Sequence, residues 1–252
     1  MKRNTLPYRS YEFEAFRPFG GGASDFLAKE VQMDWFTSDL HLGHSMVVRE
    51  RGFENVEDMH EKLYSMFDDV RKGDNLYLLG DIAWNKETAQ QFFDYLIHKV
   101  KPAAIFVIEG NHDHNWLGRI ARHPRIRYCQ TMSVKGTKAG YHPVFLSHYP
   151  HIIYDKSHYG AFHLHGHGHE TTADRPLLDN LVFGKRLNVN CELNNYRLWS
   201  RDDVEEYMRK MPENIDSILC KGYAQDKEKA IEAIKLAGKI LRQALDGVRM
   251  SD

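Results

Sequence analysis

The sequence lacks a long apolar run, and it lacks a strong excess of charge of either sign. Its 252 residues contain no stretch that could span a bilayer, which takes about 20 mostly apolar residues in a row. Residues 1–8 show no apolar core of a signal peptide. The net charge is −1, so no global basic field indicates a nucleic-acid partner. We therefore expect no membrane partner and find no strong nucleic-acid signal, although a local cleft could still hold a nucleic-acid substrate.

Cysteine is also scarce. The three cysteines, Cys129, Cys191 and Cys220, have no metal-like spacing. An odd and sparse set is typical of reduced thiols in an intracellular setting, and we expect a cytoplasmic protein. The abundant residue is histidine, with 15 copies. Because histidine is both a common metal ligand and an acid or base near neutral pH, the positions of these residues decide whether they form a site.

The chain divides into three parts by its sequence pattern. Residues 1–30 are rich in aromatic residues and glycine, and we expect an N-terminal extension that packs on the domain or covers its cleft. Residues 31–211 carry the strand-like and helix-like segments of the main domain. Residues 212–252 are expected to form a C-terminal helical extension. Its long amphipathic segment, 226–248, should pack on the domain or form a homodimer contact.

The first half of the main domain alternates strands and helices. Apolar runs at 33–37, 76–79 and 103–108 predict buried strands, and helical spacing of apolar residues predicts helices over 56–70 and 87–100. Continuously apolar strands separated by helices predict a sheet buried on both faces, with right-handed crossovers. In such sheets, ligands bind beyond the carboxyl ends of the strands.

The second half has shorter strand candidates separated by loops. They span residues 126–132, 143–147, 161–164 and 187–191. We expect them to form a second, mainly antiparallel sheet that packs against the first. Ser200 followed by Asp203 predicts a helix N-terminus, for a helix that extends to about Lys210.

Residues that can bind a metal follow most of these strands. Asp39 and His41 come after the first one, and residues two apart in an extended chain point to the same side, so this pair can converge on one point. In chain order, the motifs at the strand ends are Asp39-Leu40-His41, Gly80-Asp81, Gly110-Asn111-His112-Asp113, His148 and Gly166-His167-Gly168-His169. Carboxylates and imidazoles gathered at one sheet edge predict a metal site.

The order and residue types of these motifs closely resemble the calcineurin-like metallophosphoesterase family, over residues 33–192. The segment 39–44, Asp-Leu-His-Leu-Gly-His, is more similar to the small bacterial and phage phosphoesterases of the family than to its protein phosphatases. The protein phosphatases continue the second motif as Gly-Asp-x-Val-Asp-Arg-Gly, whereas residues 80–85 read Gly-Asp-Ile-Ala-Trp-Asn. This departure makes a phosphoprotein substrate doubtful.

The resemblance implies an α/β fold, a four-layer α/β/β/α sandwich of two mixed β-sheets flanked by helices, with two metal ions. Matched motif by motif, one ion would take Asp39, His41, Asp81 and His169, and the other would take Asp81, Asn111, His148 and His167. Asp81 would bridge the ions, since a carboxylate has two oxygens. Asn111 would bind through its amide oxygen, and His112 would face the substrate.

Phosphoester chemistry explains these residue types. Two cations about 3.5–4 Å apart neutralise an anionic phosphate ester, and the metal-bridging hydroxide that they generate attacks phosphorus. His112 is suited to assist the leaving group with a proton. Asp113 could orient the His112 ring or only cap the following helix, and the sequence leaves both roles open. Mixed nitrogen and oxygen ligands suit divalent transition metals, with Mn²⁺ expected first and Fe, Zn²⁺, Ni²⁺ or Co²⁺ as alternatives.

Further residues could contact the substrate. His44 belongs to the first motif, and a substrate contact and a structural role are equally open for it. Arg119 and Arg122 lie in an arginine-rich segment that could bind phosphate at a cleft rim or form a solvated helix face. Three aromatic residues could stack on a nucleobase, with packing in the core or at the rim as the default: Trp84, Trp116 and Tyr149.

We predict a dinuclear-metal-dependent phosphoric ester hydrolase, preferably a phosphodiesterase that acts on a small or nucleotide-like phosphoester. A phosphomonoesterase or a nuclease with the same site is the alternative within the enzymes. A non-catalytic metal-binding scaffold is the rival from another class. Scaffold members of the family have typically lost ligands, whereas this chain retains them together with His112.

Overall fold

A computed structural model describes residues 32–120, 122–136, 140–169 and 184–211, together with scattered positions between 213 and 242. The predicted N-terminal extension, residues 1–30, lies outside the described residues. Most of the C-terminal extension lies outside them as well, and its described positions from 228 onward are helical. The dimer contact expected there is still a prediction.

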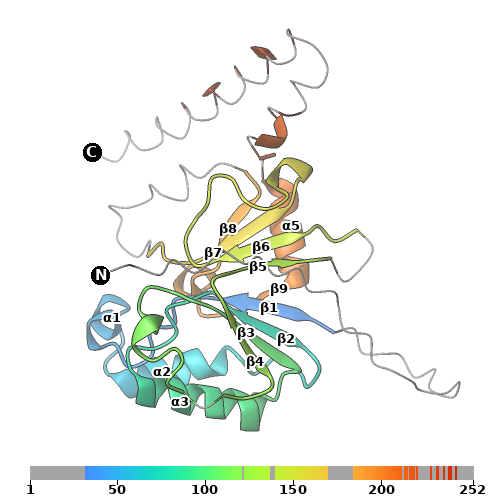
Figure 1. Cartoon of the computed structure of the whole chain (residues 1–252). Coiled ribbons are helices and arrows are strands. Elements are labelled where there is room, and N and C mark those ends of the chain that lie inside the picture. Colours follow the sequence, from blue (N-terminus) through green and yellow to red (C-terminus); the bar gives the residue numbers. More distant parts are fainter. Residues whose placement is uncertain are drawn as a thin grey trace, which may run out of the picture.

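The first half of the chain builds a five-stranded sheet in the order β4-β3-β2-β1-β9 (Figure 1). Its strands are β1 (Asp34–Thr37), β2 (Asn75–Leu78), β3 (Ala104–Ile108), β4 (Ile126–Cys129) and β9 (Trp199–Ser200). β1 to β4 are parallel, and β9 pairs with β1 in the antiparallel direction. The predicted parallel sheet is confirmed, with β1 to β3 within one residue of their expected bounds. β2 and β3 are almost entirely apolar because both faces of the sheet are covered there.

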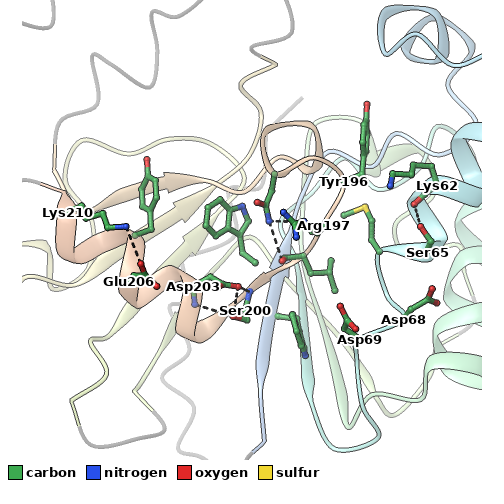
Figure 2. A pocket seen from close by; sticks show the side chains of 16 residues that line it. Lys62, Ser65, Asp68, Asp69, Tyr196, Arg197, Ser200, Asp203, Glu206 and Lys210 are labelled. Atoms are coloured by element: carbon green, nitrogen blue, oxygen red, sulfur yellow. Dashed lines mark hydrogen bonds and ion pairs between the residues drawn. The ribbon is translucent and has the colours of Figure 1, made fainter.

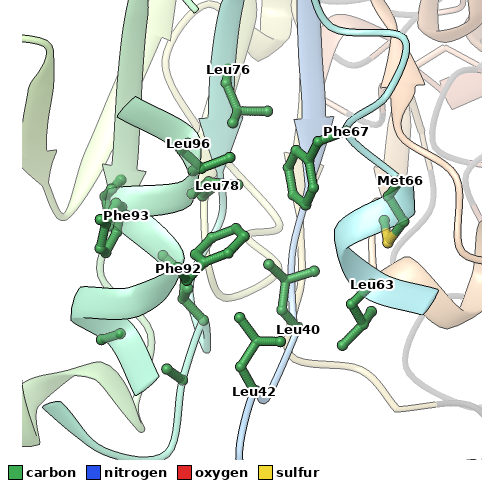
Figure 3. Packing of buried hydrophobic residues seen from close by; sticks show 14 of the residues in the cluster. Leu40, Leu42, Leu63, Met66, Phe67, Leu76, Leu78, Phe92, Phe93 and Leu96 are labelled. Carbon is green, nitrogen blue, oxygen red and sulfur yellow. The ribbon is translucent and has the colours of Figure 1, made fainter. Parts of the chain in front are cut away.

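Helices cover one face of this sheet (Figure 1). They are α1 (Ser45–Glu50), α2 (Val56–Ser65) and α3 (Lys86–Tyr95), which continues into a π-helical turn (Leu96–Val100). Leu63 of α2 and Phe92 of α3 belong to a buried cluster with Leu76 and Leu78 of β2 (Figure 3). The helical spacing in the sequence therefore located both helices, because the apolar side chains that carry it face the sheet. The helix predicted over 56–70 ends earlier, at Ser65.

The second sheet has the order β5-β6-β7-β8. Its strands are β5 (Thr131–Val134), β6 (Val144–Ser147), β7 (Phe162–His165) and β8 (Arg186–Asn188). β5 and β6 are antiparallel, but β6, β7 and β8 run parallel to one another. The prediction of a mainly antiparallel sheet is therefore wrong. The connections at 148–161 and 166–185 are long enough to return the chain to the edge where each strand starts, which parallel neighbours require.

One predicted strand, residues 126–132, serves both sheets. Its residues up to Cys129 form β4 in the first sheet, and after Gln130 the chain enters β5 of the second sheet. No glycine or proline marks this passage, so nothing in the sequence indicates a boundary between two strands. The sequence also missed α1 and β9, which are too short to show a period. Short 3-10 turns occur at Asp113–Asn115, Ser157–Tyr159 and Cys191–Asn194.

The two sheets pack face to face around a second apolar cluster. It includes Phe36 and Tyr77 from the first sheet, and Leu146 and Leu164 from the second. The sheets are therefore held together by apolar burial, which is roughly proportional to the area that they remove from water. The polar loops at their ends do not have to supply this stability.

Helix α5 (Arg201–Lys210) follows β9 and begins with the predicted capping box. The Ser200 side chain accepts a hydrogen bond from the Asp203 N–H, and the Asp203 carboxylate accepts one from the Ser200 N–H. Val204 and Met208 of α5 belong to the apolar cluster between the sheets. The sequence therefore located both the start and the end of this helix.

The observed layers are helices, first sheet and second sheet, which confirms an α/β fold with two mixed sheets. On the outer face of the second sheet, Phe145, Tyr154 and Ala161 form a small cluster. The buried Asn214 side chain donates hydrogen bonds to the carbonyl oxygens of Ser157 and Ala161. The fourth, helical layer stays a prediction. In the described part of the chain, no helix has the length and apolar character needed to cross a bilayer.

The N-cap of α2 can be tested by substitution. The exposed Asn55 side chain accepts a hydrogen bond from the Asp58 backbone N–H at 2.8 Å. We expect Asn55→Ala to lower the free energy of unfolding by about 1 kcal/mol, whereas Asn55→Ser keeps an acceptor and should stay near the wild type. Chemical denaturation measures both variants. Equal losses in the two would contradict the capping role.

Candidate metal centre

Polar side chains that follow β1, β2, β3, β6 and β7 meet at one edge of the two sheets. The structure brings all of the predicted ligands together there: Asp39, His41, Asp81, Asn111, His148, His167 and His169. They form two groups that share Asp81. The first group contains Asp39, His41, Asp81 and His169, and the second contains Asp81, Asn111, His148 and His167.

In the first group, two imidazole rings and two carboxylates face one another. His41 Nε2 lies 3.0 Å from His169 Nε2. Asp39 Oδ1 is 4.0 Å from the former nitrogen and 3.7 Å from the latter. Asp39 and His41 are buried, so these atoms converge in a site shielded from water.

The second group is built around an amide oxygen. Asn111 Oδ1 lies 3.1 Å from His148 Nε2 and 3.1 Å from His167 Nδ1. Asp81 Oδ2 is 3.5 Å from His148 Nε2. The side chain of Asn111 therefore presents its oxygen to both imidazoles, as a ligand would.

These separations fit cations of transition-metal size. Ligand atoms about 2.0–2.2 Å from an ion lie roughly 3–3.5 Å from one another. The closest pairs in the two groups are 3.0 Å and 3.1 Å apart. Imidazole nitrogens and buried carboxylates at this spacing could bind the same cation. The donor set therefore fits one divalent ion in each group.

Asp81 lies between the two groups. Its Oδ2 is 3.7 Å from His41 Nε2 and 3.5 Å from His148 Nε2. Its Oδ1 accepts a hydrogen bond from the His112 backbone N–H at 2.9 Å. A single carboxylate oxygen, rather than both, therefore faces the two groups. The other oxygen is held by the loop after β3, which fixes the rotation of the carboxylate.

Four predicted ligands have a left-handed backbone. The angle φ is 56° at Asp39, 48° at His41, 54° at Asp81 and 68° at His167. Such residues each cost about 1–3 kcal/mol, and they gather at functional sites where the surrounding structure holds them. Here the loops pair beyond the strand ends, because the Asp39 N–H donates to Gly80 O and the His41 N–H donates to Asp81 O, each at 2.9 Å.

Glycine is required beside the ligands because the loops touch. A Cβ atom at Gly110 would lie 2.3 Å from Asp81 Oδ1. A Cβ atom at Gly166 would lie 2.4 Å from Asp39 Oδ2. The glycines of these two motifs therefore leave space for the carboxylates of neighbouring loops.

Hydrogen bonds orient the ligand side chains. His148 Nδ1 donates to Leu79 O at 2.8 Å, which leaves Nε2 directed into the second group. Both carboxylate oxygens of Asp39 lie 3.1 Å from the His167 backbone N–H. Partners of this kind fix the tautomer and orientation of metal ligands.

A buried ion pair supports the first group. Glu192 Oε1 lies 3.2 Å from His169 Nδ1 and accepts a hydrogen bond of 2.6 Å from Arg51. Arg51 also donates to the carbonyl oxygens of Asp39 at 2.6 Å and Leu40 at 2.8 Å. The sequence reasoning missed Arg51 and Glu192. Glu192 directly follows a predicted strand, which was a usable signal, whereas no motif marks Arg51.

Burial and neighbouring charges set the protonation of the ligands in the absence of a cation. Burial lowers the pKa of His41 to about 2. Burial alone would also lower the pKa of His148, but its hydrogen bond with Asp81 and the charge of Asp39 raise it to about 9. Burial would raise the pKa of Asp81, yet its hydrogen bond with His148 holds it at about 2. A cation therefore has to displace a proton from His148.

A family model for the calcineurin-like phosphoesterases matches residues 35–224. The chain belongs to this family. Membership implies a metal-dependent hydrolase of phosphoesters, and the family uses divalent metals. The clustered histidines and carboxylates of this phosphoesterase are the candidates to hold them.

Two phage proteins are similar to this phosphoesterase over most of their own length. The Gene 66 protein of Mycobacterium phage D29 is 31% identical over 208 residues, which cover 72% of this chain and 98% of the phage protein. The Gene 66 protein of Mycobacterium phage L5 is 26% identical over 212 residues, which cover 71% and 95%. A crystal structure of a protein of unknown function from Aquifex aeolicus has a TM-score of 0.52 and 22% identity, covering 70% of this chain and 99% of that one. This last similarity supports the fold alone.

Asp113 has a role that differs from both alternatives left open by the sequence. Its wholly buried carboxylate accepts hydrogen bonds from the backbone N–H groups of Asp81 at 2.8 Å, Ile82 at 2.9 Å and Gly110 at 2.9 Å. Burial raises its pKa to about 6. Asp113 therefore joins the loops after β2 and β3 and acts as a positioning residue, instead of orienting the His112 ring or capping a helix.

His112 and His44 lie beside the first group. His112 Nε2 is 3.9 Å from Asp81 Oδ2, and its side chain is 34% exposed. The His44 ring centroid lies 5.8 Å from that of His41 and 6.0 Å from that of His112. Both residues therefore border the candidate site, and their contacts with a substrate are still predictions.

The topology separates Arg122 from the candidate site. Arg122 is exposed and lines a hollow with Ile126 and Tyr128, near the start of β4. Because β4 runs parallel to β3, its start lies at the edge opposite the ligands. A substrate-binding role for Arg122 is therefore not supported, and the role of the exposed Arg119 stays a prediction. Trp116 is wholly buried, so it packs in the core and cannot stack on a substrate.

Two hollows differ in their relation to the ligands. One of about 400 Å³ adjoins the second group and is lined by Asn111, His148 and Tyr149 among others. Another of about 770 Å³ lies between α2 and α5 (Figure 2). Its walls include Glu206 and Lys210, which form an ion pair at 3.2 Å, and none of the predicted ligands. The smaller hollow is therefore the one that belongs to the candidate site.

Substitution of Gly110 tests the close contact between the loops. Gly110→Ala should displace the Asp81 carboxylate and remove most of the bound metal. Gly238→Ala is the matched control, because an added Cβ there meets nothing within 4 Å. Elemental analysis of the purified variants measures the metal, and circular dichroism checks the fold. Full metal content in folded Gly110→Ala would show that the contact does not constrain the site.

The buried partner of His169 gives a second test. Glu192→Gln should weaken metal binding roughly 10- to 100-fold, because it removes the charge that orients and polarises the His169 ring. Glu206→Gln serves as the control, since Glu206 is 65% exposed and pairs with Lys210 on the surface. Calorimetric titration with Mn²⁺ measures both affinities. The same affinity in Glu192→Gln and in the wild type would rule out this role.

Proposed function

We propose that this phosphoesterase is a phosphodiesterase that uses two divalent transition-metal ions, with Mn²⁺ preferred, on a small or nucleotide-like substrate. The observation that carries the proposal is the single oxygen of Asp81 shared by the two ligand groups. Asp81 Oδ2 lies within 3.7 Å of His41 Nε2 and within 3.5 Å of His148 Nε2. A shared carboxylate oxygen at these distances favours a pair of ions over two independent sites.

The two ions would be held by the two groups described above. When bound, they would neutralise the phosphate and lower the pKa of an attacking water. The nitrogen and oxygen donors fit Mn²⁺, Fe, Zn²⁺, Co²⁺ and Ni²⁺ better than an all-oxygen cation. The chain itself holds the ligands in position. Asp113 and the glycines fix the loops that carry them, and Glu192 fixes the orientation of the His169 ring.

His112 is positioned to hold a proton at the ester oxygen that leaves. Its ring is partly exposed, so it can reach a substrate, and its Nε2 lies 3.9 Å from Asp81 Oδ2. Its backbone is anchored by the hydrogen bond to Asp81 Oδ1. An imidazole held at this point can donate a proton to a departing alkoxide as its charge develops.

The charges around the centre favour a diester over a monoester. A phosphomonoester carries a second negative charge that needs a further cation. Among the residues that the structure describes, Arg51 is an arginine next to the first group, but it is buried and bonded to Glu192 and to the carbonyl oxygens of Asp39 and Leu40. The charge of Arg51 is thus neutralised within the protein and is not available to bind the second negative charge of a phosphomonoester.

Hydrolysis of bis- and mono-nitrophenyl phosphate with Mn²⁺ tests the proposal. We expect turnover of the diester to exceed that of the monoester. Asp81→Ala should abolish both activity and most metal binding, because it removes a ligand from both groups. His112→Ala should retain metal and lose about 10²–10⁴-fold in rate, most for substrates with poor leaving groups.

The outcomes separate the rival functions. Preference for the monoester would indicate a phosphomonoesterase, and preference for polynucleotides over small diesters would indicate a nuclease. A folded, metal-loaded protein that turns over none of these substrates would be a scaffold. A rate loss in His112→Ala that is independent of the leaving-group pKa would argue against the proton-donor role.

A further inference from the structure

We infer that Trp84 and Tyr149 are two stacking surfaces on either side of the metal groups, and that the substrate is a nucleotide phosphodiester with a planar ring on each side of its phosphate. The inference rests on the proposed function, because it specifies which diester this phosphoesterase takes. Both residues are large, aromatic and partly exposed, at 45% for Trp84 and 46% for Tyr149.

Trp84 lies beside the first group, next to His112. It follows the β2 loop, where its backbone N–H donates to Leu42 O at 2.9 Å. Its ring centroid lies 4.0 Å from that of His44 and 5.6 Å from that of His112. The ring therefore contacts His44 edge-on and lies near His112, while nearly half of the residue's surface stays open to solvent.

Tyr149 lies beside the second group. It follows His148 directly, and its ring centroid is 5.0 Å from that of His148 and 4.7 Å from that of His167. It also lines the hollow of about 400 Å³ that adjoins Asn111. Tyr149 therefore forms the wall of an open space next to the second group.

The placement of the two rings beside different ligand groups matches the two substituents of a diester. A single exposed aromatic residue is ordinary. Here, however, Trp84 lies beside His112, which borders the first group, and Tyr149 lies beside His148 of the second group. Bases stack on aromatic side chains whatever their sequence, so this arrangement recognises a nucleoside without reading its base edges. The net charge of −1 favours a short nucleotide over a long polyanion.

The position of His112 assigns the two surfaces. A proton donor has to lie next to the leaving oxygen, so the leaving substituent lies on the side of Trp84. The substituent that stays on the phosphate then lies on the side of Tyr149. The two residues should therefore affect different parts of the same substrate.

Binding of AMP and ribose 5-phosphate to the Mn²⁺-loaded protein tests the stacking, without need of turnover. Calorimetry should give the wild type a preference for AMP of roughly 5- to 150-fold. Trp84→Ala and Tyr149→Ala should each reduce this ratio, and the double variant should bring it to about one. Trp84→Phe and Tyr149→Phe, which keep an aromatic ring, should each retain the wild-type preference for AMP. Tyr159→Ala, at a position 78% exposed, is the control and should leave it unchanged. Equal affinities in the wild type, or an unchanged ratio in the double variant, would overturn the inference.

Two diesters with the same leaving group test the assignment of sides. The ratio of kcat/KM for thymidine 5′-(p-nitrophenyl) phosphate to that for methyl p-nitrophenyl phosphate depends only on the substituent that is retained. Tyr149→Ala should collapse this ratio, whereas Trp84→Ala should lower both rates and preserve it. The reverse pattern would overturn the assignment. Failure to hydrolyse either diester would reject the proposed function, and AMP binding would still decide whether the rings stack.

Discussion

The carboxylate of Asp81 is the constraint on which the candidate site depends. One of its oxygens faces both ligand groups, and the other is fixed by the backbone of the loop after β3. A buried carboxylate is costly unless it is paired and hydrogen-bonded, and here the surrounding loops satisfy it. The Asp113 carboxylate accepts a hydrogen bond from the Asp81 backbone N–H, and the missing side chain of Gly110 leaves room for the Asp81 carboxylate. The two groups can share a ligand only because these contacts fix its position.

The two sheets contribute different ligands, so the site exists only when they are packed together. The first sheet supplies Asp39, His41, Asp81 and Asn111, and the second supplies His148, His167 and His169. The apolar cluster between the sheets therefore supports both stability and metal binding. Ions that bind the folded chain alone would stabilise this packing in turn, by mass action.

Charge and aromatic surface are separated in this phosphoesterase. The charged groups Asp39, Asp81, Arg51 and Glu192 are buried and bonded to one another or to the backbone. The partly exposed rings of Trp84 and Tyr149 lie farther out, beside His112 and His148. The buried charged groups would thus act on the phosphate, which is common to many substrates. The two exposed rings would select the organic substituents of that phosphate.

The sequence by itself determined the parallel sheet, the locations of α2 and α3, the start of α5 and the set of candidate metal ligands, because these features are local. Apolar spacing and residues at strand ends can be read without knowing the partner strands. Only the tertiary structure decided the division of residues 126–132 between two sheets, the parallel direction of β6 to β8 and the clamp made by Asp113. It also separated Arg122 from the ligands and paired Glu192 with His169. Each of these features depends on which distant segments of the chain become neighbours in the fold. The spacing of residues along the sequence does not contain this information.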